Sequence, residues 1–525
     1  MSADVLGGSS VDSMGQADAD AETARVRRRW TAAGAVVVAL GVALRVQSPS
    51  ALWLDEAISV SISGLPLREI NEALRQDGAP PLYALLLWGW QRLVGDTVVE
   101  VRLLSALFGV AALPAAAVAG ARLAGRAGGV AALLLFATSP FAVYYSTEAR
   151  MYSLVVLLVL CGFLVLDDYL RRPSAARGAL LAVVTAALAL SHYWSLFLIA
   201  VVGGGLLVRA RRTRSTVDAR AAAWMAAGGV LFLPWLPTFL FQLEHTGTPW
   251  GTPAGFTAVL TTVYEWSGGT GTAPRLLAIV LLLLAGVGAT ATAVSGPRLE
   301  LDLRGRPPGR GLALVVLATL VLALAVGQLT HAAFAPRYTS VVLPLFLLLA
   351  AVGIARLSRS VGTPVLVLAV AAGLTSAVPN AFYTGKTQAA MVAQALRAEA
   401  LPGDIVVYCP DQLGPATSRL LPSSLRQRTY PTGRSPARVD WTDYERRNRG
   451  ADPVAFARKV SARAGDRAVW LVSNGGYRTY EGQCEALAQE LTNVRGTPLE
   501  LVEAEDQYFE PAQLRGWAPP PSPRT

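Results

Sequence analysis

The sequence predicts a polytopic α-helical membrane protein with a small α/β domain at its C-terminal end. The chain has 525 residues, of which 53% are hydrophobic and 16% are charged, and this is too apolar for a soluble protein of such length. The apolar residues form long runs up to about residue 380 and only short ones after it. The Arg residues gather in alternate connections between the long runs, as they do in membrane proteins.

Eleven of the apolar runs are close to or above the length of a membrane-spanning helix, for which the lower limit is roughly 17 residues. No small-residue cleavage site follows the first run, so we expect it to stay as an anchor. Residues 1–24 are polar, acidic and small, and we expect them to be disordered in the cytoplasm. The predicted spans lie near 30–47, 101–121, 127–145, 151–170, 178–193, 194–209, 221–241, 274–295, 311–331, 338–355 and 361–379.

The Arg distribution predicts the orientation of these spans. If the N-terminus is cytoplasmic, behind Arg25 and Arg27, every even-numbered connection should also be basic, because cytoplasmic loops are enriched in Lys and Arg. They are basic, and the opposite connections are acidic, aromatic or nearly uncharged. The Arg residues of the cytoplasmic connections are Arg122 and Arg126; Arg171, Arg172 and Arg177; Arg209, Arg211, Arg212, Arg214 and Arg220; Arg298, Arg304, Arg306 and Arg310; Arg356 and Arg359.

The first outer connection, residues 48–100, is unusually long. Its apolar stretch 82–94 is short, and counting it as a span would place every later Arg cluster outside the cell. We therefore expect this stretch to lie along the outer membrane interface, where Trp and Leu favour it. The membrane-embedded domain then covers residues 25–380.

Residues 381–515 are expected to form an extracytoplasmic α/β domain. Strand-length runs at 404–408 and 468–472 alternate with helical patterns near 387–400, 452–464 and 480–493, which is typical of such domains. The Pro-rich end, residues 516–525, is expected to be a tail. Cys409 and Cys484 lie in this domain, and outside the cell they could pair or remain free thiols.

The net charge of +10 does not indicate nucleic-acid binding, because the basic residues follow the loop pattern of a membrane protein. The charged residues that call for explanation lie on the predicted outer face. Asp55 and Glu56 are adjacent, and carboxylates at the edge of a membrane are functional candidates. The same face carries Asp77-Gly78-Ala79-Pro80-Pro81-Leu82-Tyr83, Tyr144-Tyr145-Ser146-Thr147-Glu148-Ala149-Arg150-Met151-Tyr152 and Pro336-Arg337-Tyr338.

The motifs LDEA, PPLY, EARMYSL and PRY, at these relative positions, resemble the family-39-like group of membrane glycosyltransferases. This group includes protein O-mannosyltransferases, aminoarabinose transferases of lipid A and Rhizobium lipopolysaccharide transferases. The resemblance covers residues 30 to about 380. It implies the C-type glycosyltransferase fold in the bacterial plasma membrane, and transfer of a sugar from a polyprenyl-phosphate donor to a glycan, lipid or protein acceptor outside the cytoplasm.

The resemblance also implies roles for individual residues. Asp55 would be the general base that deprotonates the acceptor hydroxyl, with inversion at the anomeric carbon, and Glu56 would orient it or bind the acceptor. Forked contacts from Arg suit phosphate oxygens. The expected phosphate and donor contacts are Arg150, Arg337, Tyr338, Tyr152 and Glu148, and the expected acceptor or loop contacts are Asp77, His192 and Tyr83.

Simpler interpretations stand beside these roles. Arg150 could form an interfacial ion pair with Glu148, and Arg337 could be an interfacial residue at the end of a helix. His192 lies beside Tyr and Trp, as residues of the aromatic belt do. In the family a His often precedes the Pro pair, or a Lys lies nearby, whereas Ala79 stands here, so a side-chain contact from that position is missing and Asp77 and the Arg residues would have to replace it.

No Cys/His cluster has metal-ligand spacing, so the chemistry is expected to need no cofactor, although the outer carboxylates leave room for a divalent cation. Asp167-Asp168 sits beside Arg171 at the cytoplasmic end of a span, where a salt-bridged helix end explains it. Two alternatives to an enzyme are a polyprenyl-lipid transporter or flippase and a non-catalytic envelope scaffold. A transporter is disfavoured because transporters usually show internal repeats and interrupted helices at mid-membrane depth.

Overall fold

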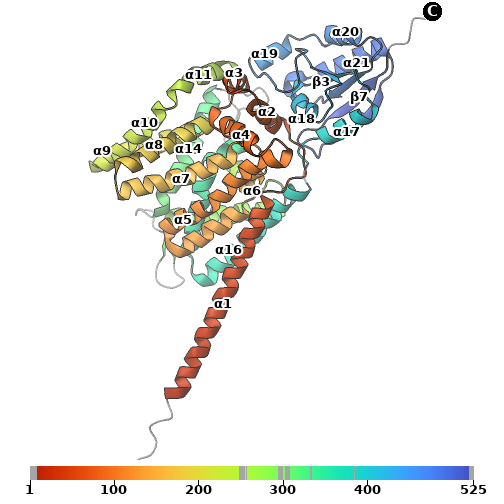
Figure 1. Ribbon diagram of the computed structural model, residues 1–525. Helices are drawn as coiled ribbons and strands as arrows, with labels where there is room; N and C mark the ends of the chain where they lie inside the picture. The colour runs from red at the N-terminus through yellow and green to blue at the C-terminus, as the bar shows by residue number, and fades with distance from the viewer. Residues whose placement is uncertain are drawn as a thin grey trace, which may run out of the picture.

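The computed structural model describes residues 9–247, 255, 257–293, 299–301, 308–330, 334–383 and 385–519. A bundle of apolar helices forms one part of the molecule, and a domain around a β-sheet lies at one end of it (Figure 1). The bundle is made of α1 (Ser9–Leu44), α5 (Val98–Thr138), α6 (Pro140–Ser146), α7 (Tyr152–Arg171), α8 (Ala175–Ser191), α9 (Ser195–Thr213), α10 (Thr216–Val230), η1 (Leu233–Trp235), α11 (Leu236–His245), α12 (Thr257–Trp266), α13 (Thr272–Thr290), α14 (Pro308–Thr330), η2 (Pro336–Val341), α15 (Leu343–Arg356) and α16 (Arg359–Phe382).

Each apolar run predicted to span the membrane overlaps a helix, but several do not match a single one: 127–145 continues from α5 into α6, 221–241 covers α10, η1 and α11, and 338–355 covers η2 and α15. Helix α5 holds residues of two runs, because its backbone leaves helical geometry at Ala124 and Gly125, where Gly125 has a φ of 63°. Within the described residues, six helical segments are long and apolar enough to cross a membrane, and α8 and α15 are shorter apolar helices. Helix α1 projects from the bundle at the end away from the β-sheet domain (Figure 1).

Helix α1 begins at Ser9, which corrects our expectation that residues 1–24 lack structure. The helical part of this segment contains Ala, Glu and Met, which favour helix. Residues 1–8 lie outside the described residues.

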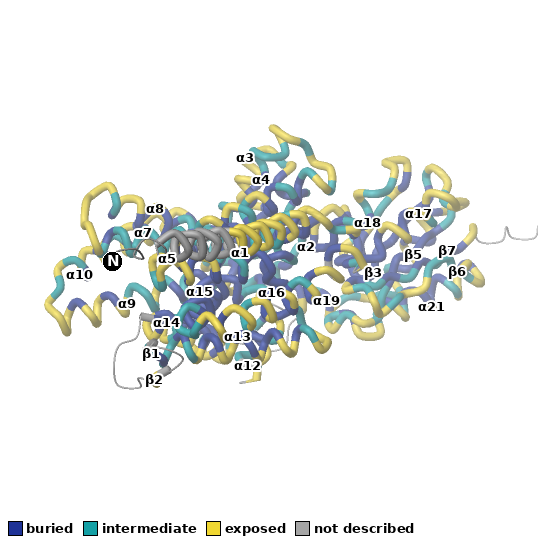
Figure 2. The backbone as a smooth tube through the Cα atoms, turned by 90° about the horizontal axis from the view of Figure 1, so that it is seen from below, coloured by how far each residue is buried: buried dark blue, intermediate teal, exposed yellow. Residues whose placement is uncertain are grey.

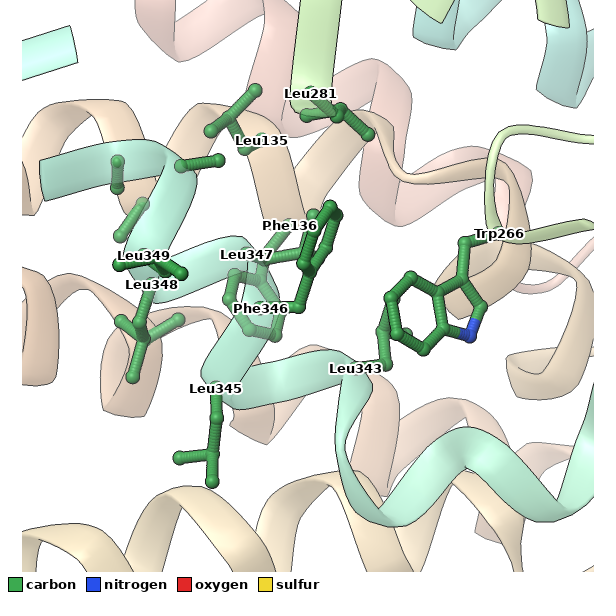
Figure 3. Close-up of a cluster of buried hydrophobic side chains, with 14 of the residues drawn as sticks. Leu135, Phe136, Trp266, Leu281, Leu343, Leu345, Phe346, Leu347, Leu348 and Leu349 are labelled. Carbon is green, nitrogen blue, oxygen red and sulfur yellow. The ribbon is translucent and has the colours of Figure 1, made fainter. Parts of the chain in front are cut away.

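The core of the bundle surrounds α15, whose residues Leu343–Ile354 are all buried. Leu345, Phe346 and their neighbours pack against α5 and α13, and Trp266 from α12 joins this cluster (Figure 3). A helix that is apolar all round is expected at the centre of a bundle. Figure 2 shows the contrast between the buried α15 and the exposed surface of α1.

The first outer connection folds into three short helices, α2 (Leu54–Ser63), α3 (Leu67–Asp77) and α4 (Pro81–Leu93). They lie between the bundle and the β-sheet domain (Figure 1). Pro80 and Pro81 stand where α4 starts, a position that tolerates Pro because the first helical N–H groups have no partner within the helix. Gly78 ends α3 with a φ of 84°, which a residue with a side chain rarely adopts.

A β-sheet of five strands, in the order β4-β3-β5-β7-β6, forms the centre of the C-terminal domain. Strands β3, β4 and β5 are parallel, while β7 runs antiparallel to β5 and β6. The elements of this domain are α17 (Ala389–Glu399), β3 (Ile405–Cys409), η3 (Asp411–Leu413), α18 (Gly414–Ser418), β4 (Arg426–Thr429), α19 (Tyr444–Arg449), α20 (Pro453–Ala464), β5 (Val469–Ser473), η4 (Arg478–Tyr480), α21 (Gln483–Arg495), β6 (Leu499–Val502) and β7 (Gln513–Trp517). A two-stranded hairpin, β1 (Ala291–Ala293) with β2 (Leu299–Leu301), lies outside this domain.

The two predicted strands are β3 and β5, and the three predicted helices are α17, α20 and α21. Strand β7 extends two residues into the stretch that we expected to be a tail, because Trp517 is 1% exposed and belongs to the core. Cys409 on β3 and Cys484 on α21 form a disulfide. This resolves the question that the sequence left open.

Candidate active site

Asp55 and Glu56 lie in the first turn of α2. Successive residues of a helix point about 100° apart, so the two carboxylates face different surroundings. Acidic side chains suit this position because the N-terminal end of a helix carries a partial positive charge. The two acids are adjacent in the sequence, but their side chains therefore point in different directions.

Glu56 is fully buried and ion-paired. Its Oε1 accepts a hydrogen bond from Arg102 Nε at 2.8 Å, and its Oε2 accepts one from Arg102 Nη2 at 2.6 Å. The Ala149 backbone N–H donates to Oε1 at 2.9 Å. Burial raises the pKa of Glu56, but the Arg102 charge and these hydrogen bonds outweigh it and lower the pKa overall. Glu56 thus connects α2 to α5 and to the turn before α7.

Asp55 lies between two Arg side chains. Its Oδ2 is 3.8 Å from Arg150 Nη2 and 3.9 Å from Arg337 Nη2, and its side chain is 17% exposed. Arg150 also donates to Ser59 Oγ at 2.9 Å, one turn further along α2. Residues 55, 150 and 337, far apart in the chain, therefore meet at one point.

Glu148 pairs with Lys386 rather than with Arg150. The Lys386 Nζ donates to Glu148 Oε1 at 3.0 Å, and both side chains are buried. The same ammonium lies 4.3 Å from the centre of the Tyr144 ring. Because Lys386 follows α16, this pair joins the start of the C-terminal domain to the turn that carries Arg150.

His192 packs between Tyr152 and Tyr338, with ring centres 5.9 and 5.3 Å away. Its Nδ1 accepts a hydrogen bond from the Trp194 backbone N–H at 3.1 Å. Burial, together with the charges of Arg150 and Arg337, lowers the pKa of His192 to about 3, so the imidazole is neutral at physiological pH. His192 is thus a neutral packing residue beside the two Arg side chains.

Asp77 and Tyr83 lie next to Arg150. Asp77, Tyr83 and Arg150 line a small cavity of about 20 Å³. Burial raises the pKa of Asp77 to about 6, although the Arg150 charge opposes this. The Tyr83 hydroxyl shares a hydrogen bond of 2.8 Å with Ser105 Oγ, which donates to the Arg150 carbonyl at 3.0 Å. Tyr83 therefore supports the Arg150 backbone and is not among the residues that line the larger cavity at Asp55.

That larger cavity has a volume of about 480 Å³ and lies between the bundle and the C-terminal domain. The bundle side contributes Asp55, Arg337 and the start of α2, and the C-terminal domain contributes the opposite wall. Its lining residues are Trp53, Leu54, Asp55, Arg337, Gln412, Trp441, Asn474, Gly476, Tyr477, Arg478, Thr479, Asp506, Tyr508, Phe509, Glu510 and Pro511.

Glu510 is the residue of this wall that contacts α2 directly. Its Oε1 accepts a hydrogen bond from the Leu54 backbone N–H at 2.9 Å, and its side chain is buried. Burial raises the pKa of Glu510 to about 8, and the charges of Asp55 and Glu56 act in the same direction. Two further contacts hold the domain in place. The Trp441 backbone N–H donates to the Gln76 carbonyl at 3.1 Å, and the Asp443 backbone N–H donates to the His245 carbonyl at 2.8 Å.

Sequence reasoning singled out Asp55, Arg150 and Arg337 but missed Lys386 and Glu510. Lys386 carried one signal, since it is one of only two Lys residues in an Arg-rich chain. Glu510 gave no such signal in the sequence, because it stands in an acidic stretch that resembles a solvated loop. Within the described part of the chain, no three His, Cys, Asp or Glu side chains come together as metal ligands would.

The chain has the C-type glycosyltransferase fold, which combines the membrane helices, the folded outer connection and the domain over the cavity. It is an integral membrane protein. The structure of ArnT from Cupriavidus metallidurans in the apo state is similar, with a TM-score of 0.62 and 15% sequence identity over 94% of this chain and 98% of ArnT. The same protein bound to undecaprenyl phosphate gives a TM-score of 0.59 and 14% identity over 93% and 98% of the two chains. No protein-family model matches the sequence, and the search of curated proteins found no match.

Proposed function

We propose that this protein transfers a sugar from a polyprenyl-phosphate carrier to an acceptor outside the cytoplasm. The observation that carries the proposal is the position of Asp55, which faces the cavity while lying within 4 Å of two Arg side chains. A base next to a phosphate site is what this transfer needs. The ArnT structure with bound undecaprenyl phosphate supports a carrier of that kind.

The transfer consists of one bond exchange. Asp55 removes the proton of an acceptor hydroxyl, whose oxygen attacks the anomeric carbon from the side opposite the phosphate. The bond between that carbon and the phosphate oxygen breaks as the glycosidic bond forms, so the configuration inverts. The polyprenyl phosphate leaves as an anion, which needs no added proton, and Asp55 holds the proton taken from the acceptor.

The two Arg side chains bind the phosphate in this proposal. Arg150 and Arg337 form charge-assisted contacts with its oxygens, and the phosphate then replaces Asp55 as their principal anion. Asp55 is released from its ion pairs in the same step and can then accept the proton of the acceptor hydroxyl. In this proposal the hydroxyls of Tyr152 and Tyr338, whose rings pack on either side of His192, add contacts to the phosphate or the sugar.

Four of the expected site residues act by positioning. Glu56 fixes the direction of α2 through Arg102, and Tyr83 supports Arg150 through Ser105. Glu148 forms an ion pair with Lys386 and so holds the start of the C-terminal domain in place. Asp77 lines the same small cavity as Arg150, so the charge of Asp77 acts on the Arg150 guanidinium.

The orientation follows from two independent features. The Arg residues of the alternate connections favour a cytoplasmic N-terminus, which leaves the C-terminal domain outside. Disulfides form in oxidising compartments and are rare in the cytosol, so the Cys409–Cys484 bridge also favours an outer location for this domain. Asp55 would then act at the outer face of the bacterial plasma membrane.

A transporter or a scaffold would not need a base in the cavity, so one experiment separates these functions. Purified full-length protein is incubated with a panel of polyprenyl-phosphate sugars, and release of polyprenyl phosphate is measured. We expect the wild type to consume one donor and Asp55→Asn to lose at least about a hundredfold in rate, which is the lower end for removal of a general base. Asp96→Asn, on an exposed acid of the same outer connection, is the matched control.

Two results contradict the proposal. If Asp55→Asn turns over donor as fast as the wild type, Asp55 is not the base. If the wild type consumes none of the donors although it is folded and binds polyprenyl phosphate, the protein is not a transferase of this kind.

A further inference from the structure

We infer that the wall of the 480 Å³ cavity formed by the C-terminal domain is a binding site for an uncharged carbohydrate, which is the acceptor of the transfer. The inference rests on the proposed function, because the hydroxyl of that carbohydrate would be the group that Asp55 deprotonates. The volume lies in the range of about 300–1,000 Å³ typical of small-molecule sites.

Aromatic rings make up much of this wall. Phe509 is 68% exposed although it is a large apolar side chain, and its ring packs edge-on against Trp53 with the centres 5.3 Å apart. Trp441 lies across the cavity and packs on Tyr444 at 4.7 Å. Sugar rings present an apolar C–H face, and rigid aromatic side chains offer it a large contact surface at a small cost in entropy. An exposed Phe held at a cavity is therefore explained by a ligand with such a face.

Polar groups also line the cavity. Gln412 is buried and its Nε2 donates to the Tyr444 hydroxyl at 3.2 Å, which holds its amide in place. Asn474 is fixed by its bonds to the Pro511 carbonyl and to the Gly476 N–H, both of 2.9 Å. Thr479 and Asp506 add a hydroxyl and a carboxylate. A cavity lined by polar groups as well as aromatic rings is suited to a sugar, whose hydroxyl groups both donate and accept.

The charges of the cavity favour a neutral ligand. Its lining has three acids, Asp55, Asp506 and Glu510, against two cations, Arg337 and Arg478, but Glu510, whose pKa is raised to about 8, is mostly protonated at neutral pH. Arg337 belongs to the donor phosphate in the proposed function, so the acceptor side is left with more acids than bases. Like charges brought together in a partly buried site repel strongly. An acceptor that carries phosphates or carboxylates is thus disfavoured.

The place of the wall in the fold agrees with this assignment. The turn Ser473-Asn474-Gly475-Gly476 follows β5, at the end of the sheet that faces α2, and parallel sheets commonly bind ligands beyond the carboxyl ends of their strands. The bundle supplies the base and the phosphate site, and the C-terminal domain supplies the surface that meets the acceptor.

The test measures binding in the absence of donor. Full-length protein in detergent is titrated with neutral mannose, arabinose and galactose oligosaccharides of two to four residues, with mannose 6-phosphate and with a Ser/Thr-containing peptide. We expect at least one neutral oligosaccharide to bind. Phe509→Ala should weaken that binding about tenfold, which corresponds to about 1.4 kcal/mol, while Phe509→Trp retains it. The control is Tyr383→Ala, on a Tyr that is 82% exposed and lies outside the cavity.

Each outcome bears on one proposal at a time. If only the phosphorylated sugar or the peptide binds, or if Phe509→Ala binds the oligosaccharide as the wild type does, the carbohydrate site is refuted. If the wild type cleaves a polyprenyl-phosphate donor and no neutral oligosaccharide binds or accepts the sugar, the transfer stands and this inference fails. If a neutral oligosaccharide binds in a manner that depends on Phe509 while no donor is cleaved, the carbohydrate site stands and the transferase function fails.

Discussion

At the scale of single residues, the site is defined by how acids and Arg side chains are paired. Asp55 contacts two Arg side chains at 3.8 and 3.9 Å, beyond the distance of a hydrogen bond, whereas Glu56 forms two short bonds to Arg102. Loose pairing leaves Asp55 free to exchange its partner for a substrate. Tight pairing makes Glu56 a fixed part of the structure.

Arg337 provides the first prediction. Arg337→Gln removes a charged contact to the donor phosphate, and such contacts are worth about 1.5–3 kcal/mol, so kcat/KM for the donor should fall by about 10- to 100-fold. Steady-state kinetics with varied donor measures this. Arg68→Gln, on a side chain that is 85% exposed on α3, should leave kcat/KM unchanged. Equal kinetics for Arg337→Gln and the wild type would remove Arg337 from the phosphate site.

At the scale of elements, α2 is held from several directions. Arg102 from α5 and the Ala149 N–H hold Glu56, Arg150 holds Ser59, and Glu510 caps the start of the helix. A buried ion pair such as Glu56–Arg102 is costly to break, because the remaining charge has no partner. The helix that carries Asp55 therefore has one defined direction relative to both Arg side chains of the site.

Glu510 gives a prediction about pH. The pKa of Glu510 is raised to about 8 in the folded protein from an ordinary value of 4.5, so the folded state keeps a proton that the unfolded chain has released. Stability should then decrease as the pH rises from about 5 to 8. Glu510→Gln mimics the protonated acid and still accepts from Leu54, so its thermal midpoint should decrease less over this range.

Thermal unfolding in detergent at several pH values tests this expectation. Glu503→Gln, on an exposed acid of the same domain, serves as the control and should follow the wild type. A Glu510→Gln protein whose midpoint changes with pH as much as that of the wild type would show that Glu510 is ionised in the folded state.

At the scale of the whole molecule, the candidate active site lies where two parts of the chain meet. Asp55 lies on α2 of the first outer connection, beside two Arg side chains from the bundle, and most of the cavity lining belongs to residues 412–511. The contacts at Gln76, His245 and Lys386 fasten the C-terminal domain at three separate places. Its position therefore determines both the shape of the cavity and the capping of α2.

The orientation of the molecule can be tested directly. Single Cys residues are introduced as Glu72→Cys on the outer connection and as Thr213→Cys at the opposite end of α9, both exposed positions, in a Cys161→Ala background. In intact cells, a membrane-impermeant maleimide should label the Cys at position 72 and not the Cys at position 213. After permeabilisation, both should react. Labelling of position 213 alone in intact cells would reverse the topology and place Asp55 in the cytoplasm.

The membrane helices could be inferred from the sequence for local reasons, whereas Arg150 and Arg337 were singled out by the resemblance of their motifs to a known family. Hydrophobic runs of spanning length are readable without tertiary contacts, and the motifs around Asp55, Arg150 and Arg337 are each contiguous. Strands β4, β6 and β7 were missed: β4 and β6 have only four residues each, β4 has a largely exposed, polar sequence, Arg426–Thr429, and β7 contains Gln, Arg and Gly in place of an apolar run. A strand of this kind is specified by its neighbour in the sheet rather than by its own pattern.

What the sequence by itself determined is the apolar bundle, its Arg-rich connections and the types of side chain available for catalysis. Only the tertiary structure decided which acid is free and which is fixed, that Glu148 pairs with Lys386, and that Glu510 lies against α2. These are contacts across 46 to 456 residues of chain. Their energies depend on burial and on the distance between charges, and neither quantity exists until the bundle and the C-terminal domain have packed together.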